Sequence, residues 1–260
     1  MRDVAATVVL PRFRSLAADE IMEKGPGDLV TVADREAEAL LTPRLADLVP
    51  GSIVVGEEAV SADPSVLEQV AHEGTVWLVD PVDGTANFAA GHEPFAMMVA
   101  LVRSGETVAA WILDPVSGVA AIAERGAGAT LGGQRITTPQ AGRPASELRG
   151  PAASTYLPVP LRAAITAAAG TIGELSPTHF CAGYEYPAVA RDEQQFAFFW
   201  RMYPWDHAPG ILFLEECGGV SRHLDGSRYD PTRPRFGVLS AQNADDWHTL
   251  RTTLLAGVPD

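Results

Sequence analysis

Residues 77–88 read Trp77-Leu78-Val79-Asp80-Pro81-Val82-Asp83-Gly84-Thr85-Ala86-Asn87-Phe88. The apolar start of this segment predicts a strand that runs straight into two carboxylates, Asp80 and Asp83. Two negative charges in one turn are costly unless a divalent cation lies between the side chains. Gly84 lets the backbone approach a ligand closely, and Thr85 supplies a hydroxyl beside the metal. The turn therefore predicts a site that binds a metal and an anion together.

The composition indicates a folded, acidic protein. A chain of 260 residues with 47% hydrophobic content has enough apolar surface for a core. Nineteen basic and thirty-three acidic residues give a formal net charge of -14, which argues against a nucleic-acid partner and suits metal cations. The two cysteines form neither a disulfide framework nor a zinc motif, so we expect a cytoplasmic location. Residues 1–16 lack an unbroken hydrophobic segment, so we expect no signal peptide and no membrane contact.

The first half of the chain predicts two helices and a series of strands. The helices are expected at residues 4–22, ended by Gly25-Pro26-Gly27 and a turn or short hairpin, and at 35–48, preceded by Asp34. The strands are expected at 52–56, 76–79, 95–103, 107–113 and 118–123. The first two strands run into acidic residues, and turn residues separate the last three. The last three therefore predict an antiparallel meander.

The second half of the chain predicts alternating helices and strands. A stretch rich in proline, alanine and glycine at 137–160 indicates a boundary between an N-terminal α+β domain, 1–145, and a C-terminal α/β domain, 146–260. Asp206 precedes a helix that ends at Gly218-Gly219. The helices are expected at 161–169, 186–190, 208–217 and 244–255, and the strands at 178–182 and 196–200.

Four acidic residues at strand ends and helix starts are candidate metal ligands. Oxygen ligands without a histidine or cysteine cluster favour Mg²⁺ or Mn²⁺ over zinc. Each acid alone has an ordinary explanation as a turn residue, a helix cap or part of a solvated loop. Two apolar strands that both end in acids make a metal site the better explanation. The candidates are Glu57, Asp80, Asp83 and Asp206.

Two other motifs are excluded by the residues around Asp83. An EF-hand loop requires oxygen ligands at alternating positions and a glutamate at its end, whereas Gly91 occupies that last position. A phosphatase with an aspartyl nucleophile requires an aspartate two residues before Asp83, where Pro81 stands. We therefore expect no phosphoenzyme intermediate.

Several blocks of the sequence resemble the inositol monophosphatase family of metal-dependent phosphatases. The resemblance extends from about residue 1 to residue 255. It implies a mixed α/β and α+β fold, a layered α-β-α-β-α sandwich of the type found in inositol monophosphatases and fructose-1,6-bisphosphatases. The blocks are Gly27-Asp28-Leu29-Val30-Thr31-Val32-Ala33-Asp34, Gly56-Glu57-Glu58, Asp80-Pro81-Val82-Asp83-Gly84-Thr85, Trp205-Asp206-His207-Ala208-Pro209-Gly210 and Glu216-Cys217-Gly218-Gly219.

The resemblance also implies a set of metal ligands. Glu57, Asp80 and the backbone carbonyl of Val82 would hold a first Mg²⁺. Asp80, Asp83 and Asp206 would hold a second Mg²⁺, with Asp80 bridging the two. A third, weaker ion would lie near Glu57, and Mn²⁺ is the alternative metal. Two cations that share one phosphate suit the hydrolysis of a phosphomonoester by in-line displacement.

The resemblance assigns catalytic and phosphate-binding roles as well. Thr85, hydrogen-bonded to Asp34, would orient and help to deprotonate the metal-activated water, with Glu57 and Asp83 as the other catalytic groups. The backbone N–H groups of Gly84, Thr85 and Ala86 would bind the phosphate. We therefore expect an enzyme that hydrolyses phosphoric monoesters.

The substrate is less well defined than the reaction. Animal-type inositol monophosphatases have a glutamate seven residues before the aspartate of the Trp-Asp block, where this chain has Phe199, which makes inositol phosphate a weaker candidate. Glu185 would suit the cation of histidinol phosphate, and Arg201 a second phosphate, as in a nucleotide 3'-phosphate or a sugar bisphosphate. Packing or surface roles explain such residues equally well. The candidate substrate-binding residues are Gly183, Tyr184, Glu185, Arg201 and Tyr203.

A catalytically idle metal-binding scaffold or regulator is the alternative from a different class. The acidic balance argues against RNA binding. Six residues that are retained together argue against idleness: Asp34, Glu57, Asp80, Asp83, Thr85 and Asp206. His92, His179 and His207 have ordinary packing or solvent roles as their default explanation. The expected partner is a small phosphorylated metabolite, and the meander at 95–123 together with the resemblance favours a homodimer.

Overall fold

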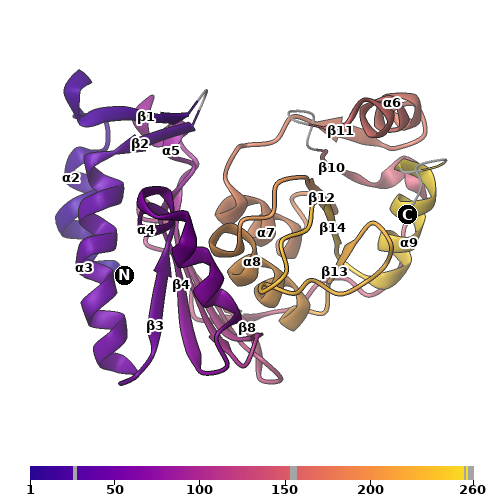
Figure 1. Ribbon diagram of the computed structural model, residues 1–260. Helices are drawn as coiled ribbons and strands as arrows, with labels where there is room; N and C mark the ends of the chain where they lie inside the picture. The colour runs from indigo at the N-terminus through magenta and orange to yellow at the C-terminus, as the bar shows by residue number, and fades with distance from the viewer. Residues whose placement is uncertain (26–27, 153–156, 255, 257–260) are drawn as a thin grey trace.

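The computed structural model describes residues 1–25, 28–152, 157–254 and 256. Helices and sheets alternate in five layers (Figure 1). Helix α3 (Val32–Leu48) and the N-terminal helical segments cover one face of a seven-stranded sheet, and α7 (Ala182–Ala190) and α8 (Pro204–Glu216) cover the other. A three-stranded sheet and an outer pair of helices, α6 (Val159–Ala168) and α9 (Ala244–Leu254), complete the sandwich. The layered fold implied by the resemblance is confirmed.

The large sheet is mixed, because only β3 and β4 run parallel. The remaining strands form the expected antiparallel meander. In β5, Met97 and Val99 face α3 while Ala96 and Met98 face α7 and α8, so this strand is apolar on both sides. The strands, in order across the sheet, are β3 (Ile53–Gly56), β4 (Thr75–Asp83), β5 (Ala96–Arg103), β6 (Glu106–Leu113), β7 (Ala120–Glu124), β8 (Gly128–Leu131) and β9 (Gln134–Ile136).

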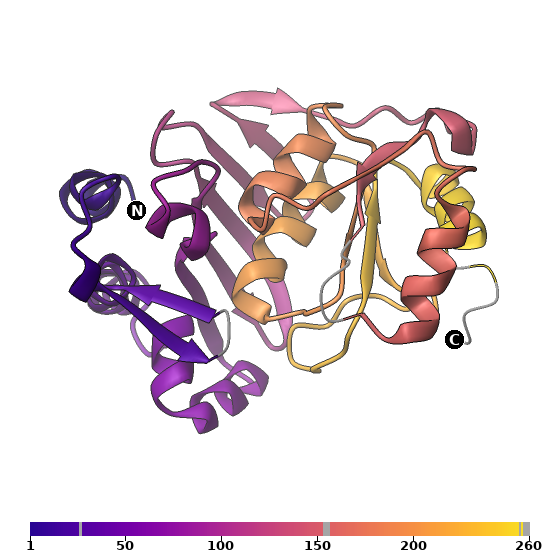
Figure 2. The same ribbon diagram turned by 90° about the horizontal axis from the view of Figure 1, so that it is seen from above.

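The second half of the chain supplies both the middle helices and the small sheet (Figure 2). Helix α8 is buried on nearly every side because it lies between the two sheets. The small sheet has the order β12 (Phe196–Phe199), β14 (Val238–Ala241) and β13 (Val220–His223), all antiparallel. A separate parallel pair joins β10 (Arg149–Pro151) to β11 (Glu174–Ser176).

The predicted N-terminal helix is too long. It consists of α1 (Arg2–Val4), a π-helical stretch at Ala5–Val9 and α2 (Leu10–Arg12), and it ends where Phe13 turns to extended backbone. The apolar residues near 21 belong to a strand instead, β1 (Ile21–Gly25), which pairs with β2 (Asp28–Thr31) in a hairpin. Pro26 and Gly27 of the predicted glycine-proline break lie outside the described residues, as does residue 255 at the end of the predicted last helix.

The predicted strand at 178–182 is also wrong. This segment is irregular, and α7 begins at Ala182, four residues earlier than expected. Its hydrogen bonds go to a buried side chain, Glu185, rather than to a neighbouring strand. The remaining predicted helices and strands are present within a few residues, while the short strands β8 to β11, β13 and β14 had no distinct periodicity to reveal them.

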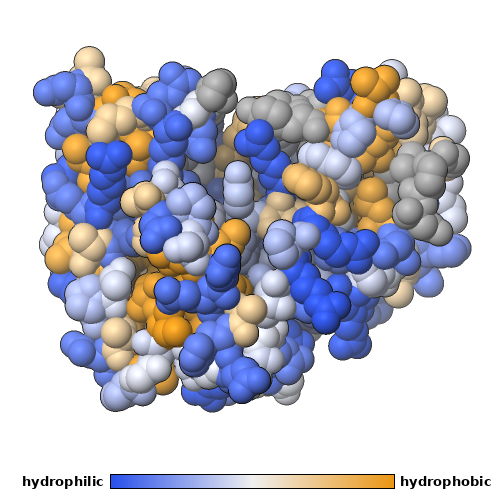
Figure 3. Space-filling view, in the orientation of Figure 1, coloured by the Kyte–Doolittle hydropathy of each residue, from blue (hydrophilic) through white to orange (hydrophobic). Residues whose placement is uncertain are grey.

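The surface in the orientation of Figure 1 is mainly hydrophilic, and hydrophobic residues form small separate groups on it (Figure 3). Among the described residues, no helix combines the length and the apolar character needed to cross a bilayer. Short structured segments complete the chain: α4 (Glu57–Ala62), α5 (Thr85–Ala89) and the 3-10 helices at Ala18–Glu20, Pro64–Ala71 and Ala145–Glu147.

Candidate active site

A bulge in β4 brings Asp80 and Asp83 to one face of the sheet. Asp80 pairs with Met98 and Asp83 with Ala96, so three residues of β4 correspond to two of β5. Side chains alternate along a strand, and residues three apart would point to opposite faces without this extra residue. The Val82 N–H donates to Asp80 Oδ1 at 3.0 Å and fixes that carboxylate. The two acids therefore project together toward the layer of α7 and α8.

The parallel pairing of β3 with β4 brings Glu57 next to these acids. Gly56 is opposite Val79, so the next residues of the two chain segments, Glu57 and Asp80, are neighbours. Asp206 comes from the third position of α8, whose first turn points to the same place. The pKa of Asp80 reflects this convergence, because the charges of Glu57, Asp206 and Asp83 all act on it.

The residues that follow Asp83 form the tight turn expected for an anion site. Gly84 has φ +85°, a left-handed conformation that favours glycine, and a methyl group on it would lie 3.0 Å from the carbonyl oxygen of Pro94. It precedes α5, whose first N–H groups have no acceptor within the helix. Gly84, Thr85 and Ala86 thus present their backbone beside the acids, as the resemblance implies.

The Thr85 hydroxyl lies within hydrogen-bond distance of Asp34. Its Oγ1 is 3.2 Å from Asp34 Oδ1 and 2.9 Å from the carbonyl oxygen of Val82. The other carboxylate oxygen of Asp34 accepts from the backbone N–H and the hydroxyl of Thr31, at 2.8 and 2.6 Å. Asp34 is therefore both a helix-capping residue of α3 and the partner of Thr85.

Burial and mutual repulsion raise the pKa of every acid in this cluster. Burial, followed by the neighbouring carboxylates, holds the pKa of Asp80 and of Asp206 well above its usual range and also raises the pKa of Glu57. Burial raises the pKa of Asp83 and that of Asp34 to about 7, although the hydrogen bonds that each carboxylate accepts lower its pKa. A divalent cation would relieve this repulsion, and an all-oxygen donor set suits Mg²⁺. The residues present thus fit the metal that the resemblance implies.

Lys24 is a site residue that sequence reasoning missed. Its Nζ lies 2.9 Å from Glu57 Oε1 and also contacts the carboxylate of Glu58, with all three side chains largely buried. Burial alone would lower the pKa of Lys24, but attraction to Glu57 and Glu58 raises it above the usual value. As the side chains stand, no three acidic, histidine or cysteine side chains of the described residues surround a common point. Lys24 is the only lysine in the sequence, a signal that could have drawn attention to it.

Glu38 is a second missed residue, and it positions Glu57. Its buried carboxylate accepts from the N–H groups of Glu58 and Ala59, both at 2.8 Å, and so holds the first turn of α4. A side chain at position 56 would overlap this carboxylate, which explains the glycine there. Burial raises the pKa of Glu38 to about 7.

Groups at the start of α7 hold Asp83, and a buried histidine follows Asp206 in α8. Asp83 Oδ2 accepts from the Gly183 N–H at 2.6 Å and from the thiol of Cys181 at 3.2 Å. Beside Asp206, the imidazole of His207 lies 3.0 Å from the Tyr186 hydroxyl and 2.8 Å from the carbonyl oxygen of Arg201. Burial lowers the pKa of His207 to about 3, so this histidine is a neutral packing residue.

Of the predicted substrate-binding residues, Glu185 requires correction. Its side chain is 0% exposed, and its carboxylate accepts from Thr178, His179 and Gln194. A carboxylate enclosed by protein donors is not available to a cationic leaving group. Arg201 and Tyr203 are exposed in the segment before Asp206, and Tyr203 stacks on Trp205 with ring centroids 5.3 Å apart. His92 and His179 are exposed.

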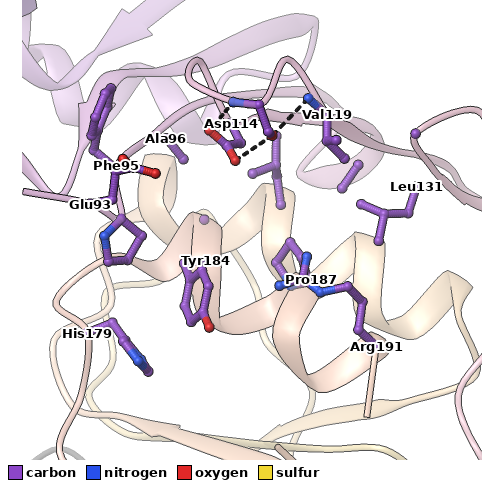
Figure 4. Close-up of a pocket in the computed structure, with 16 residues that line it drawn as sticks. Glu93, Phe95, Ala96, Asp114, Val119, Leu131, His179, Tyr184, Pro187 and Arg191 are labelled. Atoms are coloured by element: carbon purple, nitrogen blue, oxygen red, sulfur yellow. Dashed lines mark hydrogen bonds between the residues drawn. The ribbon is translucent and has the colours of Figure 1, made fainter. Parts of the chain in front are cut away.

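Gly183 and Tyr184 line a pocket of about 640 Å³ (Figure 4). Its walls are the strand face around Ile112 and Leu131 and the side of α7 that carries Tyr184, Pro187 and Arg191. None of the candidate metal ligands lines it. The aromatic side chain of Tyr184 therefore faces a mainly apolar pocket, in contact with His179 at a centroid distance of 4.6 Å.

Comparison with known proteins identifies the family. The sequence model described as the inositol monophosphatase family matches residues 2–256. The chain belongs to the inositol monophosphatase family. Membership of this family makes it a phosphoric monoester hydrolase.

Individual proteins are similar to this chain along most of its length. The inositol-1-monophosphatase of Rhizobium meliloti (strain 1021) is 32% identical over 250 residues, covering 86% of this chain and 85% of that protein. The Nus factor SuhB of Salmonella typhimurium (strain LT2) is 30% identical over 235 residues, covering 85% and 82%. The solved Thermotoga maritima IMPase is similar in fold, with a TM-score of 0.81 at 22% identity and coverage of 98% and 93%.

Proposed function

We propose that this inositol monophosphatase family member is a Mg²⁺-dependent hydrolase of a small phosphomonoester. The observation that carries the proposal is the cluster of Glu57, Asp80, Asp83 and Asp206 beside the Gly84 turn, where burial and neighbouring carboxylates raise the pKa of each acid. Such a cluster is costly in a protein without a cation to neutralise it. The turn next to it offers backbone N–H groups and a hydroxyl to an anion.

The ligand set follows from the same residues. Glu57, Asp80 and the Val82 carbonyl would hold one cation, and Asp80, Asp83 and Asp206 the other. When bound, Mg²⁺ would neutralise phosphate oxygens and stabilise the attacking and leaving oxygens of an in-line displacement. The Gly183 N–H and the Cys181 thiol orient Asp83 from behind.

Thr85 and Asp34 would act on the attacking water. The Thr85 hydroxyl donates to Asp34 Oδ1 and accepts a hydrogen bond from the water, which orients the lone pair of the water toward phosphorus. Asp34 is buried and fixed by Thr31, so it holds the hydroxyl in one orientation.

Phosphate release from a panel of phosphomonoesters, with and without Mg²⁺, tests the proposal. The panel contains inositol phosphates, histidinol phosphate, nucleotide 3'-phosphates and fructose 1,6-bisphosphate. Burial of Glu185 weakens the case for histidinol phosphate, because the carboxylate expected to pair with its cation is enclosed. Hydrolysis of at least one member only in the presence of Mg²⁺ is expected.

The second candidate function is that of a catalytically idle scaffold or regulator, which would act by binding another protein. A relative that is 30% identical is named Nus factor SuhB, and this name favours the candidate. Complete lack of hydrolysis across the panel would favour this alternative. The net charge of -14 argues against direct RNA binding. A homodimer and a cytoplasmic location remain predictions from the sequence, and a mass measurement in solution tests the first.

A further inference from the structure

Phe180 has an unusual backbone conformation for a large residue. Its φ is +55°, in the left-handed region that favours glycine, and its side chain is 62% exposed. A bulky residue adopts this conformation only where its surroundings hold it, and such positions cluster at ligand sites. An exposed phenyl ring also gains nothing from burial in the core. The folding of this chain alone therefore provides no reason for a phenylalanine here.

Four hydrogen bonds hold the segment around Phe180. The Phe180 N–H donates to Thr178 Oγ1 at 3.1 Å, and the His179 N–H donates to the buried Glu185 carboxylate at 2.8 Å. Thr178 Oγ1 itself donates to Glu185 at 3.3 Å, and Asn87 Nδ2 donates to the His179 carbonyl oxygen at 2.8 Å. Asn87 lies in α5, directly behind the Gly84 turn. The backbone of this segment is thus held on one side by Thr178 and Glu185 and on the other by Asn87. Asn87 lies in the helix that follows the candidate phosphate-binding turn.

Phe180 is also close to that turn in space. A methyl group on Gly84 would lie 3.4 Å from the Phe180 carbonyl oxygen and 3.2 Å from Cβ of Cys181, the next residue. Cys181 in turn contacts Asp83. The exposed ring therefore belongs to the residue that borders the turn proposed to bind phosphate, next to one of the candidate metal ligands.

The other side chains near the site favour an aromatic surface over a polar one. Phe199 stands where the resemblance expects a polyol-binding glutamate, and its ring packs between Tyr186 and His207. Tyr203, three residues before Asp206, is 45% exposed and stacked on Trp205. Glu185, the one acid expected in this region, is enclosed. A leaving group with many hydroxyls would find few partners here, whereas a planar ring would find a face to stack on.

We propose that Phe180 is a specificity-determining residue that stacks on the base of a nucleoside monophosphate while the Gly84 turn binds its phosphate. This inference rests on the proposed phosphatase function and names the substrate class of that site. Stacking of a base on an aromatic side chain typically strengthens binding by roughly five- to a hundredfold. The chain should accordingly prefer a nucleotide over the same sugar phosphate without a base.

The test compares adenosine 5'-monophosphate with ribose 5-phosphate, which share the ester and differ in the base. The wild-type kcat/KM should favour the nucleotide. Phe180→Leu keeps a bulky apolar side chain but removes the ring, so we expect it to lower this ratio by roughly five- to a hundredfold. Phe236→Leu is the matched control, because Phe236 is 64% exposed and stacks on Trp200 instead.

A second variant separates the role of the ring from the strain of the backbone. Phe180→Gly should raise the melting temperature by about 2–4 °C, since glycine adopts φ +55° without strain, and it should lower the nucleotide preference as Phe180→Leu does. Equal ratios in the wild type and both variants would overturn the inference, as would a change in solution mass in Phe180→Leu, which would mean that the ring packs on a second copy. Absence of hydrolysis of both compounds, and of the whole panel, would instead overturn the proposed function.

Discussion

The Thr85 hydroxyl lies between two acceptors, Asp34 Oδ1 at 3.2 Å and the Val82 carbonyl oxygen at 2.9 Å. A hydroxyl has one proton to donate, so the two acceptors compete for it. The Val82 carbonyl is also a candidate metal ligand, and a cation there would make it a poorer acceptor. Donation to Asp34 would then be favoured, which leaves a lone pair of Thr85 to receive the attacking water. The same residue thus connects the metal site to the buried acid.

Replacing Thr85 should affect turnover far more than metal binding. We expect Thr85→Ala to lower kcat by roughly 10²–10⁴-fold, the usual contribution of acid–base catalysis, while the Mg²⁺ concentration for half-maximal activity changes little. Thr85→Ser keeps the hydroxyl and should retain most activity. If Thr85 and Asp34 act on one water, Thr85→Ala combined with Asp34→Asn should be little worse than either change alone. Additive losses, measured by steady-state kinetics, would contradict a shared role.

Asp206→Asn should remove activity and stabilise the metal-free protein. Loss of a ligand to the second cation should lower Mg²⁺-dependent turnover by roughly a hundredfold or more, because metal ions stabilise transition-state charge by several kcal/mol. The same change removes one of the charges that raise the pKa of Asp80, so the melting temperature without Mg²⁺ should rise. Asp47→Asn is the control, since it makes the same charge change at an exposed position of α3. Unchanged turnover in Asp206→Asn would rule out the two-cation assignment, and Asp83→Asn should behave in the same way.

The acidic cluster could be predicted from the sequence because its signals are local. Glu57 directly follows one apolar strand, and Asp80 and Asp83 lie at the end of another. The parallel pairing of these two strands brings Glu57 beside Asp80. Lys24 and Glu38 could not be found this way, because their partners lie twenty or more residues away. The burial of Glu185 depends on donors from the loops before and after α7, and the sequence pattern does not show that these loops close over it. Glu185 therefore has a structural role, although its position in the sequence suggested a polar contact in the substrate pocket.

Stability without divalent cations should fall as the pH rises from about 5 to 8. Asp34 and Asp83 have a pKa near 7 in the folded protein against 3.8 in model peptides, so the folded state binds protons more tightly over that interval. Their contribution is complete below pH 4 and is lost as the pH rises through 7. Mg²⁺ should therefore raise the melting temperature more at pH 8 than at pH 5, as thermal scans can measure. A stability that rises with pH over this range, in chelator, would contradict the charge balance described for the cluster.

Glu38 should prove necessary for placing Glu57. The Glu38 carboxylate gives one oxygen to the N–H of Glu58 and the other to the N–H of Ala59. Glu38→Gln replaces one of these oxygens by an NH₂ group, which faces an N–H donor and cannot accept its hydrogen bond. We expect a loss of about 1–3 kcal/mol in unfolding free energy and a weaker apparent affinity for Mg²⁺. Gly56→Ala should have a similar effect by a steric route, since its methyl group would overlap the carboxylate. Glu36→Gln, two residues before Glu38 and exposed, should change neither quantity appreciably, because a surface ion pair contributes little.

Because Lys24 is the only lysine, an amine-directed reagent can report on the metal site in the unmodified enzyme. Only a neutral amine reacts, and the carboxylates of Glu57 and Glu58 raise the pKa of Lys24, so acylation of the metal-free protein should be slow. A cation bound to Glu57 would draw that carboxylate away and repel the ammonium, which lowers the pKa and should speed the reaction. Glu57→Gln should give a similar acceleration without Mg²⁺.

The α-amino group of Met1 provides the internal control for this labelling, because its pKa is set by burial and by Arg44, which lowers it, and not by the acids of the site. Mass spectrometry of the two labelled peptides gives both rates from one sample. Mg²⁺ should accelerate labelling of Lys24 several-fold and leave that of Met1 unchanged. Equal rates at Lys24 with and without Mg²⁺, at concentrations that saturate activity, would mean that no cation binds Glu57, and the first of the two metal positions would have to be abandoned.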